Sequence, residues 1–296
     1  MELSWLIRLR IAAVAAVGVA LIGIFAWPLA APLDPLGSVR ASNISPVGAA
    51  ALMLLAFGVG FISYFISWPY GREIGILAVP CGLAVWAVRS GSMAELIQLN
   101  PTLSQRQTLF SALKWESFFW LLIVAAGFAG VLLGQKSRSK PEATQTRAEA
   151  NPKIDKYLNP IIAFVGSGLV AYLCINVLAQ DVITSDSKLM TQPAVGQIVF
   201  AVLVSFGLAA FLVKKFLNLS YIYPTLASAF VTAFAIATYA RQDTLQYFVG
   251  RYPAPYFPNA VISILPVQMV VLGTLGSIAG YWLAIRYSYR RKDGTK

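Results

Sequence analysis

Histidine is absent from this chain, and charged residues are scarce. The 296 residues contain no histidine, and Asp, Glu, Lys and Arg together make up 12% of the sequence. Without histidine the chain lacks the commonest protein ligand of metals and haem and the usual proton carrier near neutral pH, so we expect no cofactor and no metal. Hydrophobic residues make up 58% of the sequence. The charged residues are too few to cover the surface of a soluble globular protein of this size, so the composition indicates a membrane protein.

Cysteines and intramembrane acids are also few. The two cysteines, Cys81 and Cys174, lie in apolar runs, where a thiol packs as a small hydrophobic group and builds no disulfide framework. No Asp or Glu lies near the middle of an apolar run, which disfavours ion-driven pumping. No nucleophile stands beside a base, and the Gly-Ser-Gly sequence at 166–168 lacks the strand that a phosphate loop requires. We therefore expect a protein that is not an enzyme.

Eight apolar runs suit helices that cross the hydrocarbon core of a bilayer, which takes about 20 residues. They cover residues 11–29, 47–67, 74–88, 117–134, 158–179, 195–213, 221–240 and 261–285. The first run is longer than the apolar part of a signal peptide, so we count it as a span. The third run is short and contains Pro80, so on its own it could be re-entrant.

Lys and Arg are distributed unequally on the two sides of these spans. The side that holds both termini carries sixteen of them, and the other side carries seven. Such residues concentrate on the cytoplasmic side, so we expect both termini in the cytoplasm and the protein in the plasma (cytoplasmic) membrane. The net charge of +11 is then a sign of topology, and we expect no nucleic acid partner.

Glycines recur at the same offsets in the fourth and eighth spans, which read GFAGVLLG at 127–134 and GTLGSIAG at 273–280. Weaker matches in all four spans of each half keep one order and nearly one offset, which indicates a tandem duplication. The third run thereby gains a full-length partner, and we count it as a span. Because four is an even number, the expected fold is all-α, with eight transmembrane helices as two parallel four-helix repeats about a pseudo-two-fold axis along the membrane normal.

This duplication divides the chain into three parts. We expect a first four-helix membrane repeat at 1–135, a polar cytoplasmic linker at 136–157 and a second four-helix membrane repeat at 158–296. The linker is basic and rich in turn-forming residues, which suits a tether between ancestral halves.

Close helix packing is the expected role of the aligned glycines, because lipid offers no hydrophobic drive for helix association. The fourth and eighth helices would meet each other there, or each would pack tightly within its own repeat. Glycine pairs also occur in membrane helices without marking a special interface, and this alternative stays open. The residues concerned are Gly127, Gly130, Gly134, Gly273, Gly276 and Gly280.

Two amides stand out among the polar residues of the spans. Asn176 and Gln268 each need several hydrogen-bond partners and could line a narrow polar path, whereas the hydroxyl groups are expected to bond between helices. Pro80 and Pro266 should interrupt the hydrogen bonds of their own helices, which bends a helix or frees carbonyl groups.

The loops opposite the termini carry the most distinctive sequence. Ser92 with Glu95 forms a possible capping box, and residues 102–117 show helical spacing, so we expect short interfacial helices between the third and fourth spans. In the second half we expect Asp243 to cap a helix that precedes an extended aromatic segment.

Two arginines should occupy equivalent outer helix ends in the two halves. Arg89 follows the third apolar run and Arg241 follows the seventh. One interpretation is an outward mouth that attracts anionic headgroups or a partner protein. The other is that both side chains snorkel to the membrane interface.

Three functions are compatible with this sequence. A structural or accessory subunit of a membrane complex accounts for the lack of midplane charge, the glycine faces and the aromatic loops. A passive or lipid-handling permease accounts for the duplication, because a path can form between halves, whereas an intramembrane enzyme needs a catalytic constellation that we do not find. We favour the subunit, in contact with the lipid bilayer and with a protein partner through exterior loops 89–116 and 241–260, and keep the permease as the alternative.

Overall fold

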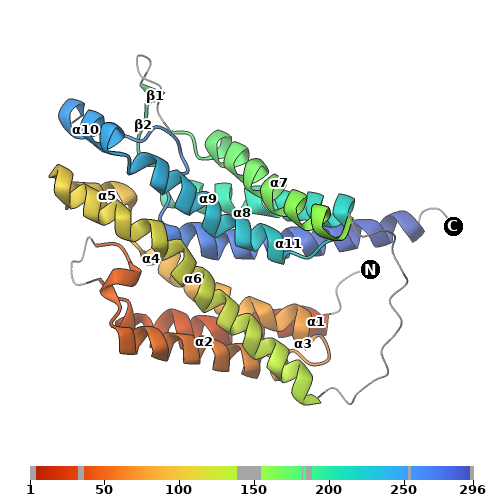
Figure 1. Ribbon diagram of the computed structural model, residues 1–296. Helices are drawn as coiled ribbons and strands as arrows, with labels where there is room; N and C mark the ends of the chain where they lie inside the picture. The colour runs from red at the N-terminus through yellow and green to blue at the C-terminus, as the bar shows by residue number, and fades with distance from the viewer. Residues whose placement is uncertain are drawn as a thin grey trace.

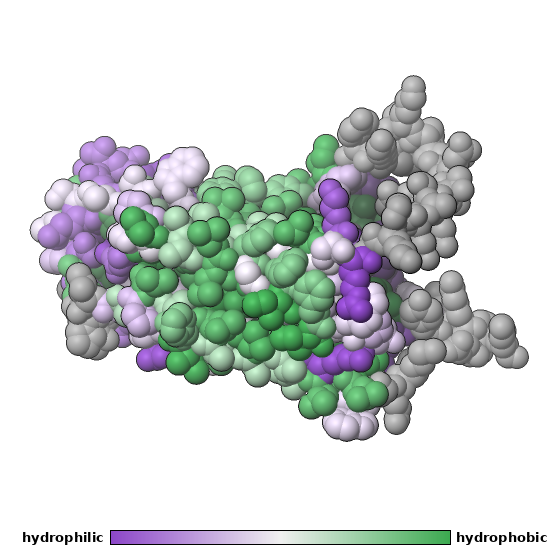
Figure 2. Space-filling view, turned by 90° about the horizontal axis from the view of Figure 1, so that it is seen from below, coloured by the Kyte–Doolittle hydropathy of each residue, from purple (hydrophilic) through white to green (hydrophobic). Residues whose placement is uncertain are grey.

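The computed structural model describes residues 5–32, 37–138, 155–181, 183–184, 189–252 and 255–293. In these ranges eight helices are long and apolar enough to cross a membrane, which is typical of an all-α integral membrane protein and confirms the eight expected spans. The first helix begins and the last helix ends at the same end of the molecule, opposite helices α5 and α10 (Figure 1). Figure 2 shows an apolar belt around the middle of the visible face, with polar residues toward both ends.

The helices and strands follow one another along the chain as follows: α1 (Trp5–Gly18), α2 (Pro46–Ile66), α3 (Gly71–Ile74), α4 (Ala78–Arg89), α5 (Met93–Gln98), α6 (Leu103–Arg138), α7 (Asp155–Leu178), β1 (Ile183–Thr184), β2 (Leu189–Met190), α8 (Val195–Leu212), α9 (Ile222–Tyr239), α10 (Gln242–Arg251) and α11 (Pro266–Asp293). A π-helical stretch, Val19–Phe25, continues α1, and another, Val213–Leu217, continues α8. A 3₁₀ turn, Gly75–Leu77, joins α3 to α4, so these three pieces make up the third span. Further 3₁₀ turns lie at Trp27–Leu29 and Ala41–Asn43.

The expectation that both prolines interrupt their own helices was wrong for Pro266, which is the first residue of α11. A proline is tolerated there because the N–H that it lacks has no partner inside the helix. The eighth span therefore begins at Pro266 and not at Val261 as its apolar run suggested. Pro80 lies in the third span, three residues after the 3₁₀ turn Gly75–Leu77 that interrupts the α-helix of this span.

Helix α6 is longer than the apolar run that predicted it. It is one continuous helix of 36 residues, about 54 Å long, which crosses the molecule diagonally (Figure 1). The separate interfacial helix expected at 102–117 is instead the beginning of α6, so that expectation was wrong. Of the predicted linker, residues 136–138 end α6, residues 155–157 begin α7, and residues 139–154 lie outside the described ranges.

The six aligned glycines lie at tight helix contacts within each half. Helix α6 packs along α2 in the first half, and α11 packs along α8 in the second. A Cβ atom at Gly130 would overlap the carbonyl oxygen of Phe57, and one at Gly276 would overlap that of Leu203. Only glycine lets the paired backbones approach so closely. The other four glycines also face helices of their own half: Gly134 faces Tyr64 in α2, Gly280 faces Gly207 in α8, Gly127 faces Val79 in α4 and Gly273 faces Ser228 in α9.

Contacts between the halves involve the third and fourth spans. Helix α6 of the first half packs on α9 of the second, and α11 of the second half packs on α4 of the first. Three edge-to-face ring pairs connect α6 with α9 and with Tyr221, the residue directly before α9. Their ring centroids are 4.8 Å apart for Phe110 with Tyr239, 5.1 Å for Phe118 with Phe230 and 5.9 Å for Phe128 with Tyr221. We call these three pairs the aromatic ladder.

Candidate functional site

The loops at the end opposite the termini form a layer that we examine as the candidate site. This loop layer consists of residues 37–45, 90–102, 189–194, 240–252 and 255–265, and it includes α5 and α10 (Figure 1). Its helix α5 begins with the expected capping box, which is confirmed. The Glu95 N–H donates to Ser92 Oγ at 3.2 Å, and the Ser92 N–H donates to Glu95 Oε2 at 2.6 Å.

Gln268 links the two halves of the protein from a buried position in the first turn of α11. Its Nε2 donates to the carbonyl oxygen of Ala87 in α4 at 3.1 Å, and its Oε1 accepts from the Leu265 N–H at 3.1 Å. The side chain is 2% exposed. Both ends of the amide are therefore bound to backbone, and Gln268 lines no open path in this structure.

Asn176 also binds backbone. Its Oδ1 accepts from the Ala260 N–H at 2.9 Å, and its Nδ2 donates to the carbonyl oxygen of Tyr172 in its own helix at 2.9 Å. A third amide, Gln192, accepts from the Ala94 N–H of α5 at 3.1 Å and donates to the Ser263 carbonyl oxygen at 3.0 Å. Asn176, Gln268 and Gln192 thus all bind the stretch 260–265.

This buried segment, residues 260–265, is non-helical and shielded from solvent along its length. Irregular backbone is tolerated at membrane depth only where protein surrounds it and satisfies its polar groups. The three amides provide such partners from α7, from α11 and from the chain between β2 and α8. Because Gln192 also binds Ala94 and Gln268 also binds Ala87, the segment is linked through these two amides to the first half.

Sequence reasoning missed Gln192. It precedes Pro193 in a loop without periodicity, and loop amides carry no pattern that identifies their partners. Asn176 and Gln268 could be singled out because an amide inside an apolar run must find hydrogen-bond partners.

The expectation that hydroxyl groups in the spans bond between helices was wrong. In the described spans, the hydroxyl groups that form hydrogen bonds donate to carbonyl oxygens of their own helix. The Ser228 hydroxyl donates to Thr225 O at 2.7 Å, and the Thr274 hydroxyl donates to Val270 O at 2.7 Å. Such back-bonding to the preceding turn satisfies the group without holding helices together. Three buried hydroxyl oxygens have no hydrogen-bond partner in the described part of the chain: Ser63 Oγ, Ser205 Oγ and Thr225 Oγ1.

Arg89 and Arg241 differ in their surroundings although both are exposed. The Arg89 guanidinium carbon lies 4.3 Å from the ring centroid of Trp27, a cation–π contact. Arg241 is the N-cap residue of α10 and makes no side-chain cap hydrogen bond. Asp243 lies within the first turn of α10 and is not its N-cap, so the expectation that it caps this helix was wrong.

We predict different effects of alanine at these two arginines. Arg89→Ala should lower the free energy of unfolding by about 0.5–1 kcal/mol, the value of an exposed cation–π contact. Arg241→Ala should change it by less than about 0.5 kcal/mol, as for most surface positions. Thermal melting of the purified variants measures both effects. If the double variant loses bound lipid or a bound partner, the two arginines do more than snorkel.

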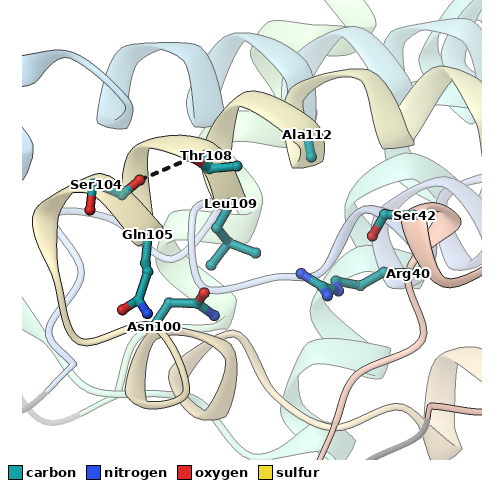
Figure 3. A pocket seen from close by; sticks show the side chains of 8 residues that line it. All are labelled: Arg40, Ser42, Asn100, Ser104, Gln105, Thr108, Leu109 and Ala112. Carbon is teal, nitrogen blue, oxygen red and sulfur yellow. Dashed lines mark hydrogen bonds between the residues drawn. The ribbon is translucent and has the colours of Figure 1, made fainter.

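A depression between the loop layer and the first turns of α6 is lined mainly by polar side chains (Figure 3). It has a volume of about 430 Å³ and is open to one side, and a neighbouring depression of about 200 Å³ shares Arg40 and Asn100 with it. We call the two together the outer groove. Its larger part is lined by Arg40, Ser42, Asn100, Ser104, Gln105, Thr108, Leu109 and Ala112.

Two buried ionisable side chains, Arg106 and Glu116, form hydrogen bonds beside the outer groove. The Arg106 Nε donates to the carbonyl oxygen of Asn100 at 3.1 Å, although the Arg106 side chain is 7% exposed. Glu116, which is 4% exposed, accepts from Trp120 Nε1 at 3.0 Å, and its carboxylate also faces Arg40 and the Ala41 N–H. Because buried ionisable groups are costly unless hydrogen-bonded, these contacts favour the observed positions of Asn100 and of the turn at Ala41 beside the groove.

The comparisons with known proteins add no assignment. Neither protein families, nor characterised proteins, nor solved structures give a match for this chain. Within the described ranges no three His, Cys, Asp or Glu side chains gather as metal ligands. The outer groove offers amide, hydroxyl and guanidinium groups, which suit recognition of a polar surface.

Proposed function

We propose that this chain is a non-enzymatic structural or accessory subunit of a membrane protein complex, whose protein partner docks on the loop layer. The observation that carries the proposal is the outer groove, a polar and preformed surface at the end opposite the termini (Figure 3). A surface that is already ordered binds a partner without paying for the ordering of loops. The capping box and Gln192 hold α5, and Arg106 holds the carbonyl oxygen of Asn100, which lines the groove.

The contact between the halves gives further support to a subunit. It is filled by large apolar side chains, which leave little room for a solute path. Phe110 of the first half and Tyr239 of the second are both almost fully buried, with ring centroids 4.8 Å apart, and Phe118 and Phe230 pack across the same contact at 5.1 Å. A passive or lipid-handling permease remains the second candidate, favoured by the partnerless hydroxyls of Ser205 and Thr225 in the second half.

We also propose two parallel four-helix repeats about a pseudo-two-fold axis along the membrane normal. Its support is the reciprocal packing of the halves, in which the fourth span of each contacts the third span of the other. The glycine contacts of α6 with α2 and of α11 with α8 are a second correspondence. Duplicated membrane proteins with an even number of helices per unit have this symmetry.

Both termini are proposed to lie in the cytoplasm, in a plasma membrane. The support is the excess of basic residues at the end where α1 begins and α11 ends. The basic residues there include Arg8, Arg10, Arg72, Lys136, Arg138, Lys214, Lys215 and Arg286. The loop layer would then face the outside of the cell.

The subunit proposal predicts a stoichiometric protein partner after mild solubilisation of a tagged copy from its native membrane. Native mass measurement and identification of the co-purified protein test it. Because Arg40 and Asn100 line both parts of the outer groove, Arg40→Glu with Asn100→Ala should lower the amount of partner at least about tenfold, the effect of one lost interface anchor.

Arg138→Glu is the matched control, since it reverses one charge at the opposite end and should retain the partner. Recovery of the unaltered chain alone, with only lipid bound, would contradict the subunit proposal and favour the permease. If the groove variant and the control lose the partner equally, the outer groove is not the docking surface.

A further inference from the structure

The end of α8 departs from a regular helix where two lysines follow each other. Its last turn is the π-helical stretch Val213–Leu217, and it ends at Asn218, which has a left-handed backbone conformation with φ of 51°. The Lys214 ammonium donates to Asn218 Oδ1 at 2.7 Å. Single π-helical turns occur often at functional sites, so this turn calls for a closer look.

Both ammonium groups form cation–π contacts. The aromatic rings belong to α11, to α8 and to the π-helical stretch that continues α8. Lys214 Nζ lies 5.2 Å from the ring centroid of Tyr281, and Lys215 Nζ lies 5.1 Å from that of Tyr287. Lys215 Nζ also lies 5.3 Å from the ring centroid of Phe216. Cation–π contacts of this kind restrict a flexible lysine, and because an ammonium group has three N–H donors, Lys214 can still donate to an anion besides Asn218.

No acidic residue in the described ranges pairs with the positive charge of this cluster. In the part of the chain that the structure describes, neither lysine forms an ion pair. Further charge comes from Arg72 of the first half, which lies close enough to the Tyr221 hydroxyl to act on it electrostatically. Tyr221 packs on Tyr281 with ring centroids 5.4 Å apart, so cations of both halves surround one aromatic cluster.

The position of the cluster indicates which anion it binds. Phe216 is 70% exposed and Tyr287 is 47% exposed, beside the end of two helices that are apolar enough to cross a membrane. Exposed aromatic rings at such helix ends lie at the level of lipid headgroups. Basic sites between membrane helices at the cytoplasmic side bind anionic headgroups.

We propose that Lys214 and Lys215, seated on Tyr281 and Tyr287, bind the phosphate of an anionic phospholipid from the surrounding leaflet. This inference is independent of the proposed partner at the loop layer, which lies at the other end of the molecule. The ligand is a lipid because the ammonium groups stand among exposed apolar rings, where an acyl chain can pack while the phosphate meets the lysines.

Native mass spectrometry of the full chain in detergent, titrated with phosphatidylglycerol or phosphatidylcholine, tests the proposal. Lys214→Gln with Lys215→Gln should weaken phosphatidylglycerol binding about thirtyfold, equivalent to about 2 kcal/mol for two lysines. Binding of phosphatidylcholine should not change. Replacing both lysines with arginine should preserve phosphatidylglycerol binding, since the charge remains.

Lys136→Gln with Arg138→Gln is the matched control. It removes two charges from the same end of the molecule, one of them stacked on Trp68 at 4.3 Å. Phosphatidylglycerol binding should fall less than threefold in this variant. A loss as large as in the lysine pair would mean that binding depends on the total positive charge at this end and not on a site at Lys214 and Lys215. Unchanged binding in the lysine pair, or displacement of the lipid by inorganic phosphate at millimolar concentration, would also overturn the proposal.

Discussion

Isoleucine at both Gly130 and Gly276 should prevent the purified protein from reaching a stable fold in detergent, and alanine at either position alone should lower its melting temperature by several degrees. A single Cβ atom at these positions already overlaps a backbone carbonyl oxygen of the facing helix. Backbone atoms cannot rotate away as a side chain can, so the helices must separate. Overpacking of a core costs about 1–3 kcal/mol even where side chains can adjust, and more is expected here.

Gly58 and Gly166 are matched controls, because a Cβ atom at either would meet nothing within 4 Å. Both lie inside membrane-crossing helices, so alanine there changes helix propensity without changing a contact. Thermal melting, followed by the fraction of protein that stays monodisperse, should separate the two groups of variants. Equal melting of Gly130→Ala and Gly58→Ala would show that the observed helix distance does not govern stability.

Replacing Gln268 with leucine should cost about 3 kcal/mol or more in stability. The change leaves the Ala87 carbonyl oxygen and the Leu265 N–H without their partner at a buried site, and each such group costs about 1–3 kcal/mol. Gln268→Glu keeps the acceptor for Leu265 but loses the donor to Ala87, so it separates the two contributions. Hydrogen–deuterium exchange should increase in the buried segment 260–265, because Gln268 holds one end of it.

Gln197→Leu is the control for this prediction. Its Nε2 donates to the carbonyl oxygens of Leu178 and Gln180, both within the second half, and the side chain is partly exposed. It should therefore affect melting less and leave exchange at 260–265 unchanged. If Gln268→Leu also leaves that exchange unchanged, Gln268 does not hold the segment.

Helix number was predictable because lipid forces apolar runs of sufficient length to be helical, which applies even to the short run around Pro80. The same criterion detects only the part of a helix that lies in lipid, so it missed the polar first turns of α6. Proline at the first helical position was an available signal for the late start of α11 at Pro266.

The candidate site was less predictable, because its contacts are distant in sequence. Gln268 could be singled out as an amide in an apolar run, but its partner Ala87 lies 181 positions away. The outer groove combines a loop around Arg40 with Asn100 and the first turns of α6; the helical spacing of 102–117 predicts a helix there but not that the loop around Arg40 lies against it. Glycine offsets are visible in one sequence, whereas the helix that faces each glycine depends on how the helices assemble.

The aromatic ladder limits how the protein can move. Its ring pairs are spread over 18 residues of α6, about 27 Å, which is close to the thickness of the hydrocarbon core. A rocking of one half against the other would have to part rings near one membrane face or the other. With Gln268 joining the halves beside the loop layer, the eight helices should behave as a single rigid body, and relative displacement of the two halves is disfavoured.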